Sequence, residues 1–301
     1  MTKISLIQNK TLGLAAALLT VSIWASFLVG TRFAVKGNFT VEEVLILRLV
    51  PGAIALSPLM LKFDLIPRDQ SWVRAIILMF GASAIFPYIV SSGLIYAPAS
   101  DGGALAPGVL PFWTALAAFF IAKERPSRLR KFGLVLILSG ALVVSLWEIF
   151  FNASSDAWKG HLRFLAGSGL FAIYSVIFRQ SGLSPLHSLI IGLFWGTLFI
   201  VPFLLWSGNV SFSQSNTHEI ILMTILQSFI IGISATFLYN FAVQQLGAAE
   251  SGAFGALTPI LALIGGVALL GELFEPTKVL GITLVTIGVL LASGIIGRNP
   301  T

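Results

Sequence analysis

The sequence contains its own duplicate, and this repeat constrains the fold more than any other feature. Residues 107–145 align with residues 255–293 at a constant offset of 148 and without a gap. The positions that are identical in the two copies are Pro111 and Pro259, Glu124 and Glu272, Gly133 and Gly281, Gly140 and Gly288, Leu136 and Leu284, Leu142 and Leu290, and Ser145 and Ser293. Repetition of prolines and glycines, which shape the backbone, indicates two copies of one structural unit. We place these units at residues 1–150 and 151–301.

Both units are too apolar for a soluble protein. Hydrophobic residues make up 56% of the chain, charged residues 10%, and the mean hydropathy is +0.95. A membrane-spanning helix needs roughly 20 apolar residues. Such runs predict ten helices, at about residues 11–33, 42–62, 72–96, 100–122, 130–150, 160–180, 187–207, 218–245, 249–271 and 276–297. The predicted fold is an all-α membrane protein with ten transmembrane helices, and the bilayer is its first partner.

The basic residues predict the orientation of the helices. With both termini on the cytoplasmic side, twelve of the eighteen Lys and Arg residues face the cytoplasm and five face outward, as the positive-inside rule requires. The chain is therefore expected to be a multi-pass protein of the inner (cytoplasmic) membrane, and its net charge of +6 does not indicate nucleic-acid binding. An odd number of helices in each half inverts the second copy. The basic cluster Lys123–Lys131 is accordingly lost from the duplicate, Gly271–Lys278.

Two copies in inverted orientation are a recurring design of secondary transporters, because they exchange shapes and expose a central site to each side in turn. The alternative is that duplication only doubled a stable helical bundle.

The duplicated segments resemble a known family. Residues 107–144 and 256–292, each with a Pro-led apolar helix, a terminal Glu and a following helix with Gly at seven-residue spacing, resemble the EamA-type repeat of the drug/metabolite transporter superfamily. Residues 24–27 (Trp-Ala-Ser-Phe) and 47–49 (Leu-Arg-Leu) are similar to the opening helices of that family. The resemblance implies a cavity between helices 1–4 and 6–9, with helices 5 and 10 as peripheral supports or homodimer contacts. It also implies the export of amino acids or other small metabolites.

Prolines within the predicted helices free backbone carbonyls and mark kinks that line something other than lipid. Pro87, Pro107, Pro111 and Pro259 are of this kind. Pro111 and Pro259 occupy equivalent positions in the two halves, where a carrier needs a hinge twice. Simple bending for helix packing is the alternative.

Polar and aromatic side chains in the same helices suggest a solute pocket. Tyr88 and Ser92 share one helical face, as do Thr236 and Asn240, although hydrogen bonding between helices would also explain them. At an offset of 147, Trp24 aligns with Phe171, Phe27 with Tyr174, and Arg32 with Arg179. Such rings are suited to apolar or aromatic groups of a solute. The candidate substrate-binding residues are Trp24, Phe27, Tyr88, Ser92, Pro111, Trp113, Phe171, Tyr174, Tyr239, Asn240 and Pro259.

Three charged positions have competing interpretations. Arg48 lies inside the second predicted helix, at a cost of roughly 2.5–3.5 kcal/mol if central. It is expected to pair with Glu42, Glu43 or Asp101, or alternatively to attract a substrate carboxylate. Glu124 and Glu272 precede the fifth and tenth helices, whose positive N-termini a carboxylate would complement.

The repeated glycines predict close helix contact, either inside the chain or across a dimer.

Other classes of function lack their signatures. The motif GxxxxGK[ST] of ATP-driven pumps is missing, the chain has no Cys, and His161, His187 and His218 fall at loops or helix ends. No catalytic residue, metal or cofactor is therefore expected, and only Asp101 and Glu250 are candidates for a proton relay. The predicted function is the export of amino acids or similar small metabolites by alternating access. The alternatives are a sugar-phosphate or nucleotide-sugar exchanger, which needs several basic residues in its cavity, and a non-transporting scaffold or enzyme.

Overall fold

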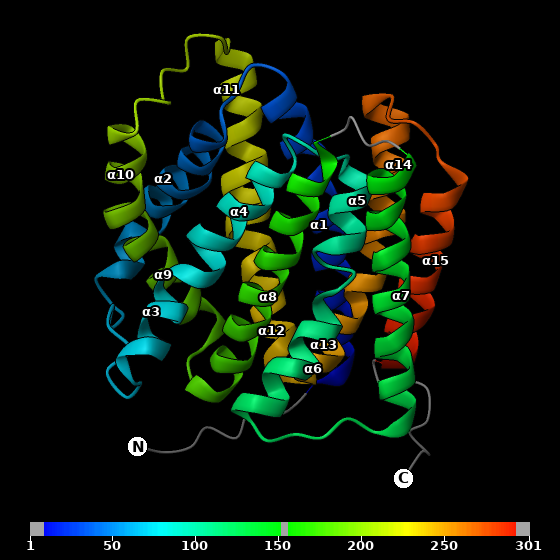
Figure 1. Cartoon of the computed structure of the whole chain (residues 1–301). Coiled ribbons are helices and arrows are strands. Elements are labelled where there is room, and N and C mark those ends of the chain that lie inside the picture. Colours follow the sequence, from blue (N-terminus) through cyan, green and yellow to red (C-terminus); the bar gives the residue numbers. More distant parts are fainter. Residues whose placement is uncertain (1–8, 152–155, 293–301) are drawn as a thin grey trace.

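The computed structural model describes residues 9–151 and 156–292 as a bundle of helices, with no strand among those residues (Figure 1). The first half consists of α1 (Lys10–Lys36), α2 (Val41–Met60), α3 (Trp72–Phe80), the π-helical η1 (Gly81–Ile85), α4 (Phe86–Gly93), α5 (Ala99–Leu105), α6 (Leu110–Ile121) and α7 (Arg128–Phe151). The second half consists of α8 (Ala157–Ser181), α9 (Pro185–Trp195), the π-helical η2 (Gly196–Ile200), α10 (Val201–Trp206), α11 (Thr217–Thr224), the π-helical η3 (Ile225–Ala235), α12 (Thr236–Leu246), α13 (Ala248–Ala253), the 3-10 helix η4 (Phe254–Ala256), α14 (Leu257–Leu270) and α15 (Pro276–Ala292).

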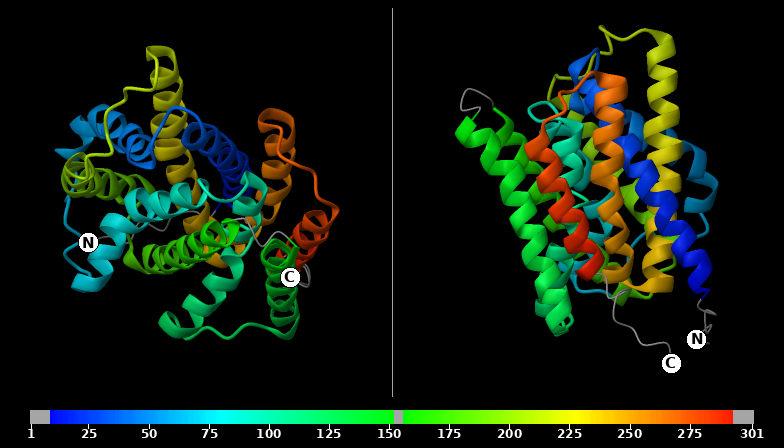
Figure 2. Two further views of the ribbon diagram at one scale, coloured as in Figure 1. Left: turned by 45° about the horizontal axis from the view of Figure 1, so that its top comes forward. Right: turned by 90° about the vertical axis from the view of Figure 1, so that its right-hand side faces the viewer.

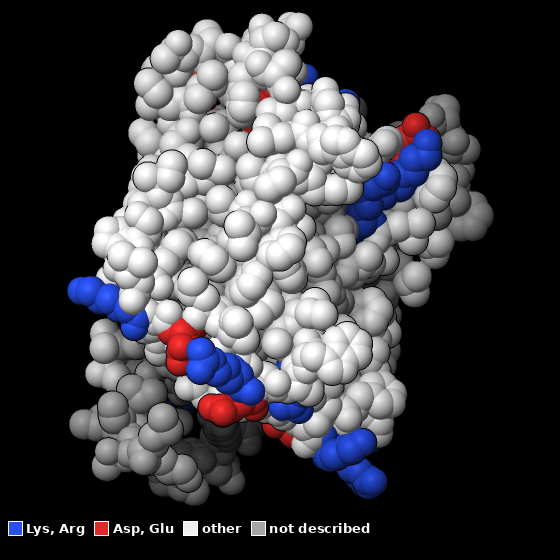
Figure 3. Space-filling model, turned by 90° about the vertical axis from the view of Figure 1, so that its left-hand side faces the viewer, with Lys and Arg blue, Asp and Glu red and all other residues white. Residues whose placement is uncertain are grey.

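The helices group into apolar spans. Within the described residues, nine helical stretches are long and apolar enough to cross a membrane. The tenth predicted span, 276–297, is described as far as Ala292 as a helix of 17 residues, and residues 293–297 lie outside the described part. On the side of the molecule in Figure 3, Lys, Arg, Asp and Glu gather toward the two ends of the bundle and leave a broad uncharged surface between them.

The two halves run in opposite directions. α1 begins at the face of the bundle where α15 ends, and α8 begins at the opposite face (Figures 1 and 2). We call the first of these the terminal face and the second the distal face. At the distal face, α2 and α11 start at capping boxes. Thr40 and Asn216 accept from the backbone of Glu43 and Glu219, whose carboxylates accept from the backbone N–H of the capping residues. Such boxes satisfy N–H groups that a helix start leaves unpaired.

The predicted spans 100–122 and 249–271 are present as apolar helical stretches, and each is interrupted. The first is divided between α5 and α6 at residues 106–109, and the second is divided by η4 at residues 254–256, the equivalent place at an offset of 148. Pro107 cannot donate a backbone hydrogen bond there. The Ala106 carbonyl accepts from Ser168 Oγ at 2.6 Å, and the Ala256 carbonyl accepts from Thr286 Oγ1 at 3.3 Å. Side chains of neighbouring helices thus satisfy backbone groups that the breaks release.

The repeated glycines pack α7 against α15 inside the chain. A Cβ atom added at Gly140 would lie 2.5 Å from the Gly281 carbonyl oxygen, and one at Gly288 would lie 2.7 Å from the Gly133 carbonyl oxygen. Only glycine permits such a close approach of two backbones. Of the two interpretations of these glycines, contact within the chain is therefore the one observed.

Candidate functional site

A cluster of aromatic rings lies where the two halves meet. The Trp24 ring of α1 lies 5.6 Å from the Phe171 ring of α8 and 5.1 Å from the Tyr239 ring of α12. Phe171 in turn lies 4.5 Å from Phe86 and 5.7 Å from Tyr174. Four of these rings belong to the predicted site, whereas Phe86 was not predicted. It precedes Pro87, and that proline was the only signal in the sequence for it.

Buried hydrogen bonds hold the tyrosines of this cluster in place. The Tyr174 hydroxyl donates to Asn240 Oδ1 at 3.1 Å and lies 2.9 Å from the Ser188 hydroxyl. The Tyr239 hydroxyl lies 2.8 Å from the Ser175 hydroxyl. Asn240 is fully buried, and its Nδ2 has no hydrogen-bond partner among the described residues. The cluster therefore carries an available donor beside its rings.

A small cavity borders the aromatic cluster. Trp24, Phe27, Phe86, Pro107 and Phe171 contribute to its lining, and its volume is about 20 Å³. That is room for about one water molecule. In this conformation the side chains fill most of the space that the family resemblance assigns to a central cavity. The break between α5 and α6 lies at its wall, beside the rings.

The other predicted site residues lie around this centre or away from it. Trp113 packs against the central clusters, and Pro111 is buried in the first turn of α6. Pro259 lies against Gly103, where an added Cβ would be 2.8 Å from its Cα. Tyr88 instead donates to Glu42 Oε1 at 3.1 Å, and Ser92 donates to the Ile89 carbonyl of its own helix. Tyr88 and Ser92 share a face, as predicted, but the structure does not bring them to the aromatic cluster.

A larger cavity of about 460 Å³ lies at the terminal face. Its wall includes Thr114 of α6, one turn beyond Leu110 of the central cavity. Ala248 lines it as well and also packs against the aromatic cluster. The charged residues in its wall are Glu124, Arg130, Arg179 and Glu250. We call this cavity the vestibule. A single layer of side chains therefore separates it from the aromatic rings.

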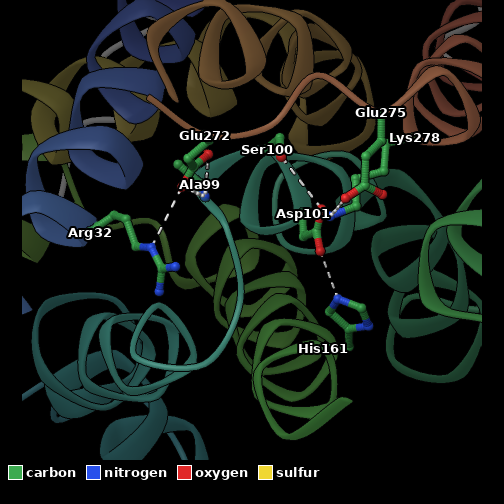
Figure 4. Close-up of polar contacts among 8 residues, drawn as sticks. All are labelled: Arg32, Ala99, Ser100, Asp101, His161, Glu272, Glu275 and Lys278. Carbon is green, nitrogen blue, oxygen red and sulfur yellow. Dashed lines mark hydrogen bonds and ion pairs between the residues drawn. The ribbon is translucent and has the colours of Figure 1, made fainter. Parts of the chain in front are cut away.

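The distal face is closed by an ion pair between the two halves (Figure 4). The Arg32 Nε atom lies 3.5 Å from Glu272 Oε1, and Arg32 also donates to the Leu94 carbonyl. The Glu272 carboxylate accepts from the Ala99 backbone N–H at 2.9 Å. Glu272 was predicted to complement the helix that follows it. It instead meets the first residue of α5, because the α14–α15 connection folds over that helix end.

Next to this pair is a buried charged cluster (Figure 4). Asp101 Oδ2 lies 2.9 Å from His161 Nε2, and Asp101 Oδ1 lies 3.4 Å from Lys278 Nζ. The side chains of all three are at most 3% exposed. His161 was predicted at a loop or helix end, and it does lie in the first two turns of α8, but α5 and α15 enclose it. Loop segments of the two halves meet nearby as well, because Asn38 donates to Glu219 at 3.0 Å and the Ser211 N–H donates to Glu43 at 3.0 Å.

The closed and open faces carry equivalent residues. At an offset of 147 Arg32 corresponds to Arg179, and at an offset of 148 Glu272 corresponds to Glu124 and Ala99 to Gly247. We call Arg32, Glu272 and the Ala99 N–H the distal latch, and Arg179, Glu124 and Gly247 the terminal latch. In the terminal latch both charged side chains are exposed, they line the vestibule, and they form no ion pair with each other among the described residues. The Arg–Glu ion pair is therefore formed in the distal latch and not in the terminal latch.

Arg48 does not have the expected carboxylate partner. Its side chain forms no ion pair within the described part of the chain, and it is 5% exposed. Glu42 accepts from Tyr88, Glu43 accepts from its own helix cap and from Ser211, and Asp101 faces His161. The guanidinium instead lies over the Phe27 ring, 5.2 Å from its centroid. The predicted structural pairing was therefore wrong, because the candidate carboxylates are engaged elsewhere.

Comparison with known proteins establishes the family. The sequence profile described as the EamA-like transporter family matches residues 11–146 and 158–294, one match in each half. The chain belongs to the EamA-like transporter family. In the residues that the structure describes, no group of three His, Cys, Asp or Glu side chains is arranged to hold a metal ion.

Individual relatives are distant. A protein described as a probable terminal-alkyne amino-acid exporter, from Streptantibioticus cattleyicolor, is 26% identical over 285 residues, which is 92% of this chain and 91% of that protein. The uncharacterized transporter YyaM of Bacillus subtilis is 27% identical over 229 residues, covering 74% of this chain and 72% of that protein. A solved crystal structure shares the fold with a TM-score of 0.62 at 16% identity, covering 96% of this chain and 98% of its own. This EamA-like chain thus has relatives along most of its length.

Proposed function

We propose that this EamA-like transporter exports amino acids or similarly small amphipathic metabolites across the cytoplasmic membrane, with both termini in the cytoplasm, and that it works by alternating access. The observation that carries the proposal is the pair of latches. Arg32 and Glu272 join the halves at the distal face, while the equivalent Arg179 and Glu124 stand apart around a cavity of about 460 Å³ at the terminal face.

The mechanism follows from the symmetry of the two units. When the distal latch opens and the terminal latch closes, the halves exchange conformations, and the vestibule moves to the other side. The breaks at residues 106–109 and 254–256 allow the half-helices beside each latch to move separately. The aromatic cluster remains between the two faces and holds the solute in both states.

The size and chemistry of the centre support a small amphipathic solute. Rings of Trp24, Phe171 and Tyr239 suit an apolar side chain, and the Asn240 amide supplies a hydrogen bond. The description of the Streptantibioticus relative as an amino-acid exporter agrees with this chemistry.

Two measurements on purified protein in proteoliposomes test the proposal. The first is counterflow of radiolabelled amino acids, for which we expect saturable flux of at least one apolar or aromatic member. The second uses the absence of Cys from the chain. Bridging Arg32→Cys and Glu272→Cys with a short cleavable thiol linker should stop flux, and cleavage of the linker should restore it. Full flux through the bridged protein would contradict alternating access at the distal face.

A further inference from the structure

Arg48 is a buried cation that forms no ion pair with any of the residues that the structure describes. Its Nη1 atom has no hydrogen-bond partner among the described residues, and the Phe27 ring is the group that faces its charge. Burial of an uncompensated charge inside a membrane protein is costly, and such residues mark the path of a solute or ion. The position of Arg48 therefore requires an explanation other than stability.

Two side chains of η3, the helical segment that packs on α2, have unsatisfied polar atoms. Gln227 and Ser228 of η3 are fully buried, and neither Gln227 Oε1 nor Ser228 Oγ has a partner in the described structure. Gln227 Nε2 donates to Thr31 Oγ1 at 2.8 Å, which fixes the orientation of the amide. The three groups supply two donors, from Arg48 and Ser228, and one acceptor, from Gln227.

Glycine contacts place Arg48 and Ser228 in one layer between α2 and η3, and the hydrogen bond to Thr31 places Gln227 against α1, one turn from Phe27. A Cβ added at Gly52, one turn after Arg48, would lie 2.9 Å from Ser228 Oγ. A Cβ added at Gly232, one turn after Ser228, would lie 3.6 Å from Arg48 Cγ. The face of α2 that carries Arg48 thus packs directly on the face of η3 that carries Ser228. A π-helical segment such as η3 is frequent at functional sites.

Phe27 connects this polar layer to the aromatic centre. One side of its ring faces Arg48, and the residue also lines the central cavity together with Trp24 and Phe171. A solute with a charged head and an apolar tail would meet the polar layer with its head and the rings with its tail.

We infer that Arg48, Ser228 and Gln227 form a head-group site for the transported solute, and that this site takes an α-amino acid. The carboxylate accepts from Arg48 and Ser228, and the ammonium donates to Gln227 Oε1. The inference rests on the proposed transport function and specifies its substrate class. The central cavity beside Phe27 holds about one water and is not lined by these three residues, so the solute enters this site in a state in which the bundle is more open.

The wild-type protein provides the first test. Thermal unfolding is measured in detergent with L-phenylalanine, L-leucine and L-methionine, each beside its uncharged-carboxyl counterpart, the amino-acid amide. Chloride and inorganic phosphate serve as further arms. We expect at least one acid to raise the unfolding midpoint by mass action. Its amide should need an at least about tenfold higher concentration to give the same rise. Equal effects of acid and amide, or an equal effect of chloride or phosphate, would overturn the assignment.

Variants provide the second test. Arg48→Gln should weaken binding of the effective acid by at least about tenfold, and it should raise the unfolding midpoint of the ligand-free protein, because an uncompensated buried charge is removed. A merely structural Arg48 would give the opposite change in the ligand-free protein. Arg163→Gln is the matched control. Arg163 also lies over a ring, 4.7 Å from the centroid of Tyr96, but outside this layer, and its replacement should leave binding unchanged. Arg48→Lys, which keeps the charge, should retain part of the binding, and Gln227→Leu should weaken it without touching Arg48.

The outcomes separate this inference from the proposed function. The transported solute could lack a carboxylate, and its flux could be undiminished in Arg48→Gln. That result would overturn the head-group site but would not contradict transport. Neither binding nor flux for any member of the panel would overturn both. Acid-selective binding that Arg48→Gln abolishes supports the site, whatever the rate of transport.

Discussion

The Nε atom of Arg32 lies 3.5 Å from Oε1 of Glu272, and this contact joins the end of α1 to the connection between the last two helices. Both side chains are largely enclosed, at 16% and 11% exposure. Their counterparts Arg179 and Glu124 are exposed to the vestibule at the opposite face. The duplicated sequence has therefore produced two copies of one latch, of which the distal copy is paired and the terminal copy is not.

Charge reversal at the terminal latch should be reciprocal. Glu124→Arg and Arg179→Glu each place like charges where the latch closes, so we expect each to lower flux about tenfold or more, which corresponds to about 1.4 kcal/mol. The double variant should recover much of that flux, because the attraction is restored with its sign exchanged. Arg128→Glu, an exposed neighbour outside the vestibule wall, is the control. An additive loss in the double variant would show that the two residues do not pair in any state.

The glycine contact between α7 and α15 should tolerate no added methyl group. A Cβ at Gly140 would meet the Gly281 carbonyl at 2.5 Å, and backbone cannot move aside as a side chain can. We expect Gly140→Ala to destabilise the protein by about 1–3 kcal/mol, measured as a lower thermal unfolding midpoint in detergent. Gly252→Ala is the matched control, since its nearest neighbours would be 3.9 Å away. An unchanged midpoint in Gly140→Ala would contradict the helix contact described above.

The Trp24 ring should matter for the solute more than for the fold. It is only partly buried and lines the central cavity, where it contacts Phe171 and Tyr239. We expect Trp24→Ala to raise the KM for apolar amino acids about tenfold or more while the protein still folds, and Trp24→Phe to retain much of the affinity. Trp206→Ala, at a residue that is 83% exposed, should change neither. Equal kinetic effects of the two alanine variants would argue against pocket lining by Trp24.

The buried cluster of Asp101, His161 and Lys278 should depend on its carboxylate. Asp101→Asn removes the negative charge that faces the Lys278 ammonium at 3.4 Å. Loss of one partner of a buried ion pair costs about 3–5 kcal/mol, so a marked fall of the unfolding midpoint is expected. Joining it with Lys278→Met should restore most of the stability, because the buried ammonium that has lost the Asp101 carboxylate is then removed as well. If the double variant proves less stable than Asp101→Asn, the ion pair is not the source of the loss.

The sequence predicted an all-helical membrane fold in two inverted repeats. Nine of the ten predicted spans have the length and hydropathy of a membrane span within the described residues, because hydropathy and duplication are properties of the chain itself. The predicted spans 100–122 and 249–271 are each interrupted. The first interruption contains Pro107, where the sequence predicted a kink, whereas residues 254–256 contain no proline. The hydropathy of both spans is uniform across the breaks, and the hydroxyls that satisfy the released carbonyls, those of Ser168 and Thr286, come from distant helices.

Pairing of charged side chains was a failure of sequence reasoning. Arg48 was expected to pair with a carboxylate and pairs with none in the described part of the chain, where it lies over Phe27 instead. The Glu272 carboxylate was expected to complement the helix that follows it and accepts from the first residue of α5. Proximity along the chain suggested both expectations. Which carboxylate is nearest in space depends on how the connections fold, and no local pattern encodes that.

The sequence by itself determined that this chain is a membrane protein, that it consists of two related units, and that equivalent residues such as Glu124 and Glu272 recur at one spacing. Only the tertiary structure decided that one of these glutamates is latched to an arginine and the other is not. The reason is that an ion pair forms between side chains brought within a few ångströms of each other. Among the described residues, the equivalent Arg and Glu side chains meet that condition at the distal face and not at the terminal face.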